Sequence, residues 1–398
     1  MNLSIFNFKS ACFCFAALLS VSIAQEAAPG KSAASLLSTA LASLTRAPDY
    51  DEEPGMINGY ELQSELRGKG DPLRQTELIR TLLRDAAPRA GKPQWGWGVN
   101  KALDAFGDGS FTPAGTPYSI TSAVAIHALL DYATQALADP KLVAEISRVL
   151  ENVIEHWIDF GFEPATVKRG GFFHYSMADH DANFTVNCSI ALASAIARSL
   201  SLPTMSPSAN TSRWRACVES AIALAVAQLT PDVNGDPSWF YHDTEVSGKP
   251  WVNYRQDLVH HVYTLHSFEI LRDLGYTVPW TRASSLRSLG QYWRQDKLMS
   301  FPSDARFPPQ DEYLIDWPAR LWGTGLYLRF VSIYGTDHQA QQVLRALDAY
   351  NLVTNPRSWA SGFQPEASAT ALDLAHCSIG LAEFLHRLDK TRSRRSHR

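Results

Sequence analysis

The chain has 398 residues, of which 45% are hydrophobic and 19% are charged, and its formal net charge is −4. This length exceeds what one small core needs, and it fits one large domain or two ordinary ones. The slightly acidic balance excludes the strongly basic surface that a nucleic-acid-binding protein carries, so no nucleic-acid partner is expected.

The N-terminal segment has the pattern of an export signal. Lys9 precedes a short apolar run, and the run ends in a small-x-small cleavage pattern at Ala24. The run is too short for a membrane span, and no later segment is long and apolar enough for one. We therefore expect a signal peptide at 1–24, a flexible or helical lead-in at 25–44, and a secreted or periplasmic protein without a membrane span.

Three cysteines remain beyond this segment: Cys188, Cys217 and Cys377. An odd number excludes a complete disulfide framework, so either one bridge with a free thiol or three buried thiols fit. No CxxC pair is present, which argues against a zinc ribbon. We expect neither a metal nor a cofactor.

Helical periodicity dominates the rest of the chain, and strand-like alternation is scarce. Turns rich in Gly and Pro separate the segments, but no long linker divides them. This pattern predicts a single domain at 45–388, followed by a basic disordered tail at 389–398. The predicted helices are 32–46, 73–87, 119–137, 141–158, 184–200, 212–229, 256–274, 280–295, 313–334, 337–350 and 368–388.

A repeat is visible in these helices. Five of them begin with a polar or aromatic cluster and then become small and apolar, and their matching points lie about 57 to 70 residues apart. Helices with one charged face alternate with them, as an inner and an outer ring of helices require. The sequence thus predicts an all-α, single-domain (α/α) toroid of five or six helical hairpins, with 32–46 and 73–87 as the sixth. The matching points are Thr121, Asn187, Asp257, Asp316 and Asp373.

The chain resembles the (α/α) toroid carbohydrate-active enzymes, which include polysaccharide lyases and glycoside hydrolases. The stretch QLTPDVNGDPSWFY is similar to a Gln…Gly…Trp turn of several toroids. The segments FHYS…D…NFTVNCSIALASAIA and SWFY…WVNYRQDLVHHVY look like an uncharacterised toroid group associated with exopolysaccharides. The resemblance implies a polysaccharide or oligosaccharide substrate.

A group of polar side chains stands at the start of the predicted helix 256–274. Asp257, His260 and His261 lie there, ahead of an apolar stripe. In a toroid the ends of the inner helices surround a central cavity, so these groups are expected to face a ligand. The alternative is that Asp257 caps the helix and the histidines are satisfied buried groups.

Three further clusters are expected to converge on the same cavity. The first combines His174, Tyr175, Asp179, His180, Asp181, Asn183 and Asn187. The second combines Asp311, Glu312, Tyr313, Asp316, Trp317 and Arg320. The third offers aromatic and hydrogen-bonding groups for sugar rings: Trp239, Tyr241, His242, Trp251, Asn253 and Tyr254.

Two chemistries fit these residues, β-elimination and glycoside hydrolysis, and β-elimination is favoured. β-Elimination on a uronate-containing glycan needs an acid and base, for which the candidates are His260, His261, Tyr254, His174, Tyr175 and Asp257. It also needs amides or cations beside the uronate, and the predicted substrate-binding residues are Asn183, Asn187, Arg255, Trp239, Tyr241, Trp251, Asp316, Trp317 and Arg320.

Inverting glycoside hydrolysis needs two carboxylates instead. Asp179, Asp257, Glu312 and Asp316 are candidates, but no spacing rule selects a pair. A non-catalytic glycan-binding or exopolysaccharide accessory protein is the third possibility, because binding and cleaving sites share the same aromatic residues.

Overall fold

The computed structural model describes residues 53–106, 109–166, 170–205, 210–241, 254–307, 309–349 and 371–396. The predicted signal peptide and lead-in lie outside these ranges. Within them almost all of the regular secondary structure is helical, and no helix is both long and apolar enough to cross a bilayer.

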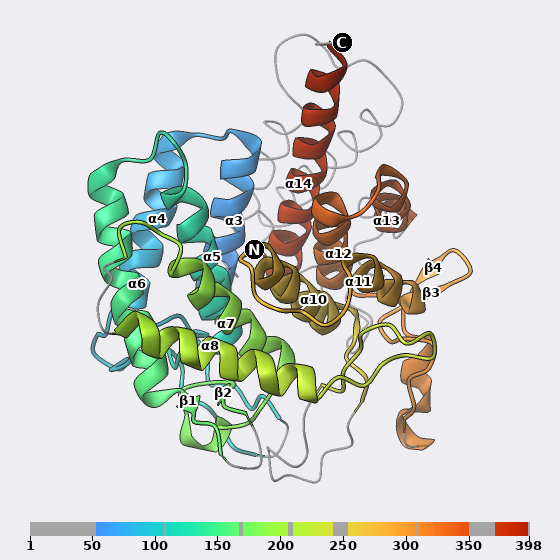
Figure 1. The fold of residues 1–398 in the computed structure, drawn as a ribbon, viewed down its shortest axis with the longest axis horizontal. Coiled ribbons are helices and arrows are strands. Elements are labelled where there is room, and N and C mark those ends of the chain that lie inside the picture. Colours follow the sequence, from blue (N-terminus) through green and yellow to red (C-terminus); the bar gives the residue numbers. More distant parts are fainter. Residues whose placement is uncertain are drawn as a thin grey trace, which may run out of the picture.

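Six helices form an inner ring (Figure 1). Each contacts the next one, and the last contacts the first, so the ring is closed. The ring confirms the predicted all-α toroid. In ring order the helices are α3 (Pro54–Gly68), α5 (Ser119–Ala133), α7 (Val186–Ser199), α10 (Leu258–Asp273), α12 (Leu321–Tyr334) and α14 (Ala371–Ser396).

A second set of helices packs outside this ring. α6 is typical, because its buried residues Ile146, Leu150, Val153 and Trp157 follow one helical face while the opposite face is polar. The alternation of inner and outer helices is therefore as the sequence predicts. The outer helices are α4 (Pro72–Ala86), α6 (Pro140–Phe160), α8 (Asn210–Ala227), α11 (Arg282–Ser288) and α13 (Asp337–Ala349).

Helix α3 was not predicted, and the predicted helix 32–46 lies outside the described residues; α3 is the inner partner of α4. Gly55 and Gly59 lower its helix propensity, and its burial on nearly all sides removes the one-sided apolar stripe. The glycines allow close packing instead. A Cβ on Gly59 would lie 3.0 Å from the Val124 side chain, and one on Gly55 would lie 2.7 Å from that of Trp97.

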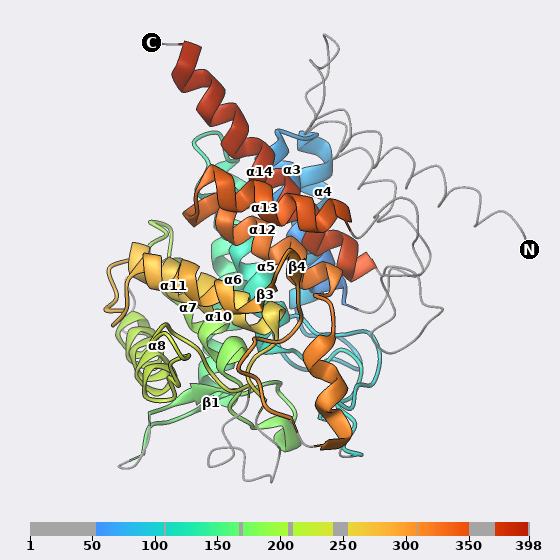
Figure 2. The same cartoon turned by 90° about the vertical axis from the view of Figure 1, so that its right-hand side faces the viewer.

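Three other boundaries differ from prediction. The expected helix 280–295 is the short α11, followed by the 3₁₀ helix η2 (Leu289–Tyr292) and a strand. The expected single helix 313–334 is the 3₁₀ helix η3 (Pro309–Asp316), an extended stretch, and then α12. The extended stretch pairs with the chain after strand β4 (Lys297–Leu298), which itself pairs with β3 (Trp293–Arg294). Helix α14 continues through the residues predicted as a disordered tail, because Lys and Arg are good helix formers, and its end projects from the body in Figure 2.

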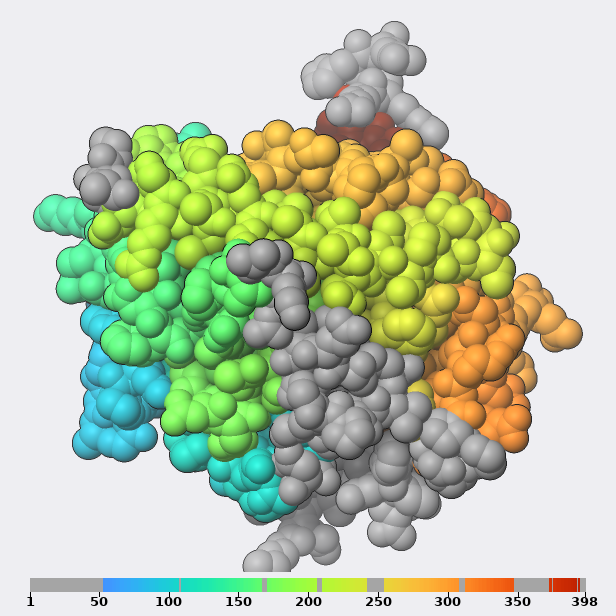
Figure 3. All heavy atoms as spheres, turned by 60° about the horizontal axis from the view of Figure 1, so that its bottom comes forward, coloured from blue at the N-terminus to red at the C-terminus, as the bar shows by residue number. Residues whose placement is uncertain are grey.

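The inner helices begin on one face of the molecule, which we call the mouth. Short backbone bridges join the segments that lead into them, such as Tyr118 with Ser176 and Phe240 with Arg255. The Leu258 amide likewise donates to the Ser300 carbonyl over 2.7 Å. The small hairpin of β1 (Phe162–Glu163) and β2 (Phe172–Phe173) lies on the same side of the molecule (Figure 1). Atoms of the loops ahead of α5, α7, α10 and α12 share the face seen in Figure 3.

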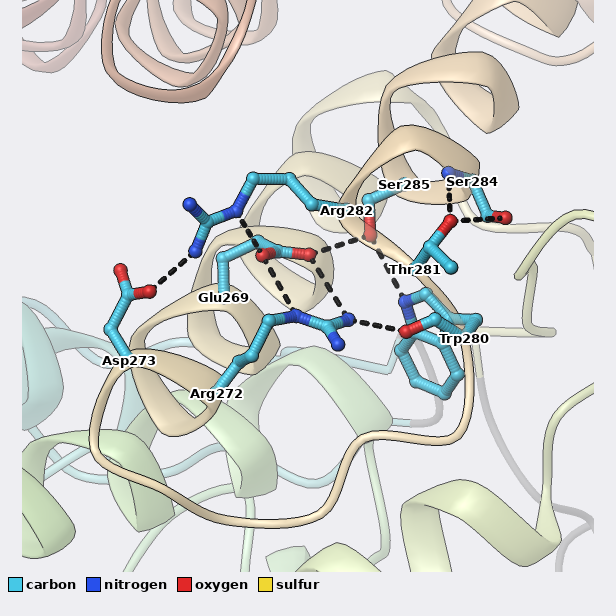
Figure 4. A network of polar contacts seen from close by, with 8 residues as sticks. All are labelled: Glu269, Arg272, Asp273, Trp280, Thr281, Arg282, Ser284 and Ser285. Carbon is cyan, nitrogen blue, oxygen red and sulfur yellow. Dashed lines mark hydrogen bonds and ion pairs between the residues drawn. The ribbon is translucent and has the colours of Figure 1, made fainter.

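A buried ion network joins α10 to the short helix α11 (Figure 4). The fully buried Glu269 carboxylate accepts hydrogen bonds from Arg282 Nε at 2.7 Å, Ser285 Oγ at 2.8 Å and Arg272 Nε at 3.1 Å. Arg272 also donates to the Trp280 carbonyl over 2.6 Å. This seven-residue helix is therefore held by polar contacts as well as by apolar packing.

Candidate functional site

Two tyrosines lie together at the mouth. Tyr175 comes shortly before α7 and Tyr241 shortly before α10, and their hydroxyl groups are hydrogen-bonded to each other. The Tyr241 ring stands edge-on to the His260 ring at 4.5 Å, and the Tyr175 ring stands edge-on to Tyr118 at 5.5 Å. Burial raises the pKa of both phenols well above the usual 10, so both stay protonated.

Asp257 and His260 form a hydrogen-bonded pair next to this tyrosine pair. Asp257 is the N-cap of α10, and its Oδ1 accepts from the His260 amide at 3.1 Å and from His260 Nδ1 at 2.7 Å. The capping alternative is therefore correct for Asp257, yet both side chains keep more than a fifth of their surface exposed. With Nδ1 donating to the carboxylate, a neutral His260 presents Nε2 as an acceptor.

The Asp257 carboxyl is ionised at neutral pH. Burial by itself raises its pKa, but the charge of His260, the two hydrogen bonds from His260 and the nearby Arg320 guanidinium together lower the pKa below its usual value. Asp257 is thus in the unprotonated form that a general base needs.

A second carboxylate, Glu53, belongs to the same mouth. It occupies the N-cap position of α3 without making a capping bond. Its negative charge contributes to raising the pKa of Tyr118 and Tyr175 at the mouth and of Tyr60 below it, three tyrosines from different segments. α3 and α10 are three places apart in the six-helix ring, so Glu53 and Asp257 are carried by opposite helices.

Sequence reasoning missed Glu53. Its signal is local and weak, because a Glu followed by Pro marks only the start of a helix. Glu53 lies near the tyrosine pair only because the closed ring brings the start of α3 close to the segments before α7 and α10.

Aromatic and cationic groups line the α12 side of the mouth. The exposed Arg320 stands at the N-cap position of α12, with its guanidinium 5.9 Å from both the Trp317 and the Trp322 ring. The Trp322 ring in turn lies 6.2 Å from that of His260. Asp316 is further out, because its side chain is 86% exposed and pairs with Arg294 at 3.2 Å.

Below the mouth, three side chains form what we call the brace. The Tyr60 and Tyr263 hydroxyls are 2.5 Å apart, and Tyr263 Oη lies 2.8 Å from His376 Nε2. His376 Nδ1 donates to the Leu372 carbonyl over 2.6 Å, so Nε2 accepts from Tyr263, which accepts from Tyr60. The brace links α3, α10 and α14 and supports the floor of the site.

Two predicted site residues belong to the core instead. Trp239 is fully buried, donates from Nε1 to the Ala225 carbonyl at 2.8 Å and stacks on Phe268. His261 is also fully buried, with Nε2 3.0 Å from Ser288 Oγ, because adjacent helix residues point about 100° apart and its neighbour His260 faces the mouth. Neither side chain can contact a substrate, so these two predictions are wrong.

Other predicted residues make contacts with groups other than Glu53 and Asp257. Arg255 donates to the Thr230 carbonyl and lies 3.3 Å from Asp304. Asn183 closes a local turn by donating to the His180 carbonyl at 3.3 Å. His174 stands beside Glu163 of the β1–β2 hairpin, 3.9 Å away.

The remaining candidates are placed as follows. Asn187 is buried in the first turn of α7, where its Nδ2 lies 3.4 Å from Cys188 Sγ and its Oδ1 has no hydrogen-bond partner. Tyr254 packs on Phe307, and its carbonyl accepts from the Tyr241 amide at 2.9 Å. Trp251 lies outside the described residues.

Cys188, Cys217 and Cys377 are free and buried, which decides between the two alternatives for the cysteines. Within the described ranges, no three His, Cys, Asp or Glu side chains are grouped as a metal site requires.

The sequence matches no known family model and no curated protein. Solved structures are similar. A cellobiose 2-epimerase from Spirochaeta thermophila is 13% identical with a TM-score of 0.52, over 85% of this chain and 86% of that one. An alpha-amylase from Clostridium perfringens is 10% identical with a TM-score of 0.50, over 83% and 86%. The chain has the (α/α) toroid fold found in carbohydrate-active enzymes.

This likeness extends over most of the toroid and concerns the fold. PssZ from Listeria monocytogenes is also similar, at 8% identity and a TM-score of 0.46. At such identities the active groups of this toroid have to be argued from its own residues.

Proposed function

We propose that the protein is a secreted enzyme that hydrolyses a polysaccharide, with Glu53 and Asp257 as its two carboxylates. The observation that carries the proposal is their placement. The two residues start opposite helices of the ring, and the hydrogen-bonded pair Tyr175–Tyr241 experiences the charge of Glu53 at one phenol and that of Asp257 at the other.

The ionised state of Asp257 assigns it the role of base, and Glu53 takes the complementary role of acid. Asp257 is ionised, so it would take a proton from a water molecule as that water attacks the anomeric carbon. Glu53, in its protonated form, would give its proton to the departing glycosidic oxygen, which balances the proton taken up by Asp257. Because Asp257 also holds His260 through a 2.7 Å bond, His260 would position the base. Trp322 and Trp317 offer aromatic faces for sugar rings.

The fold supports a saccharide substrate. The two similar toroids above are named as an enzyme that epimerises cellobiose and as an alpha-amylase. For this chain the glycan is a proposal, and so is its export, which rests on the N-terminal pattern ending at Ala24.

The test combines a substrate panel with matched variants. Purified protein is incubated with neutral and uronate-containing polysaccharides, and both reducing ends and the ultraviolet absorbance of unsaturated ends are followed. We expect reducing ends without absorbance, and a kcat lowered about 10²- to 10⁴-fold in Asp257→Asn and in Glu53→Gln. Glu145→Gln on the exposed face of α6 is the control and should keep the activity. Full activity in Glu53→Gln would refute the carboxylate pair.

β-Elimination is the second candidate, and one contact favours it. The Tyr241 ring touches His260, whose Nε2 is available as a base, with Arg320 nearby to neutralise a uronate. A lyase would give ultraviolet absorbance together with reducing ends, and it would lose activity in His260→Gln and Tyr241→Phe. Binding without either product would instead indicate an accessory protein.

Export has its own test. N-terminal sequencing of protein from the native host should show a chain that begins near Gln25, outside the cytoplasm. An intact Met1 in the cytoplasmic fraction would contradict the proposed signal peptide.

A further inference from the structure

A buried arginine inside the ring has no ion partner. Arg329 of α12 is 91% buried, since its exposed fraction is 9%. Its Nε has no hydrogen-bond partner, and among the described residues no carboxylate forms an ion pair with it. The guanidinium carbon instead lies over the face of the Tyr60 ring, 5.8 Å from the ring centroid. A buried charge without a counter-charge is costly, so an arginine in this position calls for one.

The nearest carboxylate is already occupied. Asp131 of α5 is close enough for the Arg329 charge to help lower its pKa. However, its Oδ1 accepts from Arg198 at 2.5 Å, and its Oδ2 accepts from Gln63 Nε2 at 2.7 Å. Asp131 is therefore the counter-charge of Arg198, and the positive charge of Arg329 remains.

The histidines around Arg329 do not change this balance. Burial, helped by the nearby arginines, lowers the pKa of His127 to about 3 and that of His266 well below 6.5, so both are neutral at physiological pH. Arg67, which also lies near Asp131, is paired with Glu383 at 2.6 Å. The group of Arg67, Arg198, Arg329, Asp131 and Glu383 thus carries one net positive charge.

Other atoms near the same level of the ring also have no partner. His266 Nδ1 on α10, Gln63 Oε1 on α3 and Ser332 Oγ on α12 are buried without a hydrogen bond. His266 and Arg329 both lie eight residues beyond the first residue of their helices, and Gln63 lies nine beyond, so all three are deeper than the brace. Water could satisfy these polar atoms, but it would not neutralise the guanidinium.

We propose that the interior of the toroid binds a small monovalent anion, with chloride as its simplest form, against the guanidinium of Arg329. A single atom suits the position, because a side chain that is nine-tenths buried leaves little room beside it. His266 and Ser332 can turn N–H and O–H donors toward the ion, and a water molecule can bridge it to Gln63. The anion would lie below the brace and would serve the stability of the ring, independently of any reaction at the mouth.

The first test is thermal stability at constant ionic strength. The full-length mature protein is melted in sodium chloride and in sodium gluconate, whose anion is too large for the interior. Chloride at about one hundred times its Kd should raise Tm by about 3 °C over gluconate. Arg329→Gln should abolish the difference, whereas Arg80→Gln on the exposed face of α4 should keep it.

The second test does not depend on whether Arg329→Gln folds. Crystals of the wild-type protein are soaked in sodium bromide, and anomalous scattering is measured at the bromine edge. A bromide peak in contact with the Arg329 guanidinium is expected. Absence of a peak there, or an equal Tm in chloride and gluconate, would overturn the proposal.

Discussion

Removal of the Glu269 carboxylate should destabilise the toroid strongly. Glu269 is fully buried in α10 and accepts four hydrogen bonds, three of them from the two arginines Arg272 and Arg282 (Figure 4). Loss of one member of a buried ion pair costs about 3–5 kcal/mol, because the remaining charge is left without a partner.

The solvent exposure of the two arginines determines where in this range the loss of unfolding free energy falls. The side chains of Arg272 and Arg282 are 25% and 38% exposed, and Arg282 keeps its contact with Asp273 at 2.5 Å. Water therefore recovers part of the loss, and we expect Glu269→Ala to lower the free energy of unfolding by about 3 kcal/mol.

Urea denaturation followed by far-ultraviolet circular dichroism measures this change. Glu145→Ala, on the exposed face of α6, is the matched control and should stay within about 0.5 kcal/mol of the wild type. A loss below about 1 kcal/mol in Glu269→Ala would show that the network contributes little to the docking of α11.

Three further predictions concern stability. His261 and His376 are buried and His127 is partly buried, and this desolvation lowers the pKa values of His127, His261 and His376 to about 3, 3 and 4. The unfolded chain therefore binds more protons than the folded one from about pH 6.5 down to pH 4. Urea titrations should show the free energy of unfolding falling through that window by up to ~4 kcal/mol per pH unit. A free energy of unfolding that stays constant from about pH 7 to 4.5 would contradict this. Tyr263→Phe removes the middle hydroxyl of the brace and should cost about 1–3 kcal/mol in the same assay, and an unchanged urea midpoint would mean that the brace is not formed. Trp239→Ala should cost about 3–5 kcal/mol through the cavity it leaves, while the folded protein keeps its saccharide affinity in calorimetry; a selective loss of affinity would restore Trp239 to the site.

The architecture could be predicted because it depends on patterns among residues that are close together in the sequence. The recurrence of polar-headed apolar helices every 57 to 70 residues indicates repeated hairpins, and the one-sided stripe of α6 marks an outer helix. Asp257 and His260 were also accessible to sequence reasoning. Their spacing of three places them on one helix face, and the start of an inner helix is at the mouth.

The details of the site depended on contacts between distant segments. Only the packing of α10 distinguishes His260, at the mouth, from the adjacent His261, in the core. Helix α3 is packed through Gly55 and Gly59, whose neighbours come from residues more than 40 positions away.

The sequence by itself therefore determined the toroid, the polar starts of its inner helices and the candidates Asp257, His260 and His261. The tertiary structure alone decided that Glu53 stands across the ring from Asp257, and that Trp239 belongs to the core. The physical reason is one of range. Helix periodicity and capping act within a few residues, whereas burial and the electrostatic environment of a side chain are set by whichever segments the closed ring brings beside it.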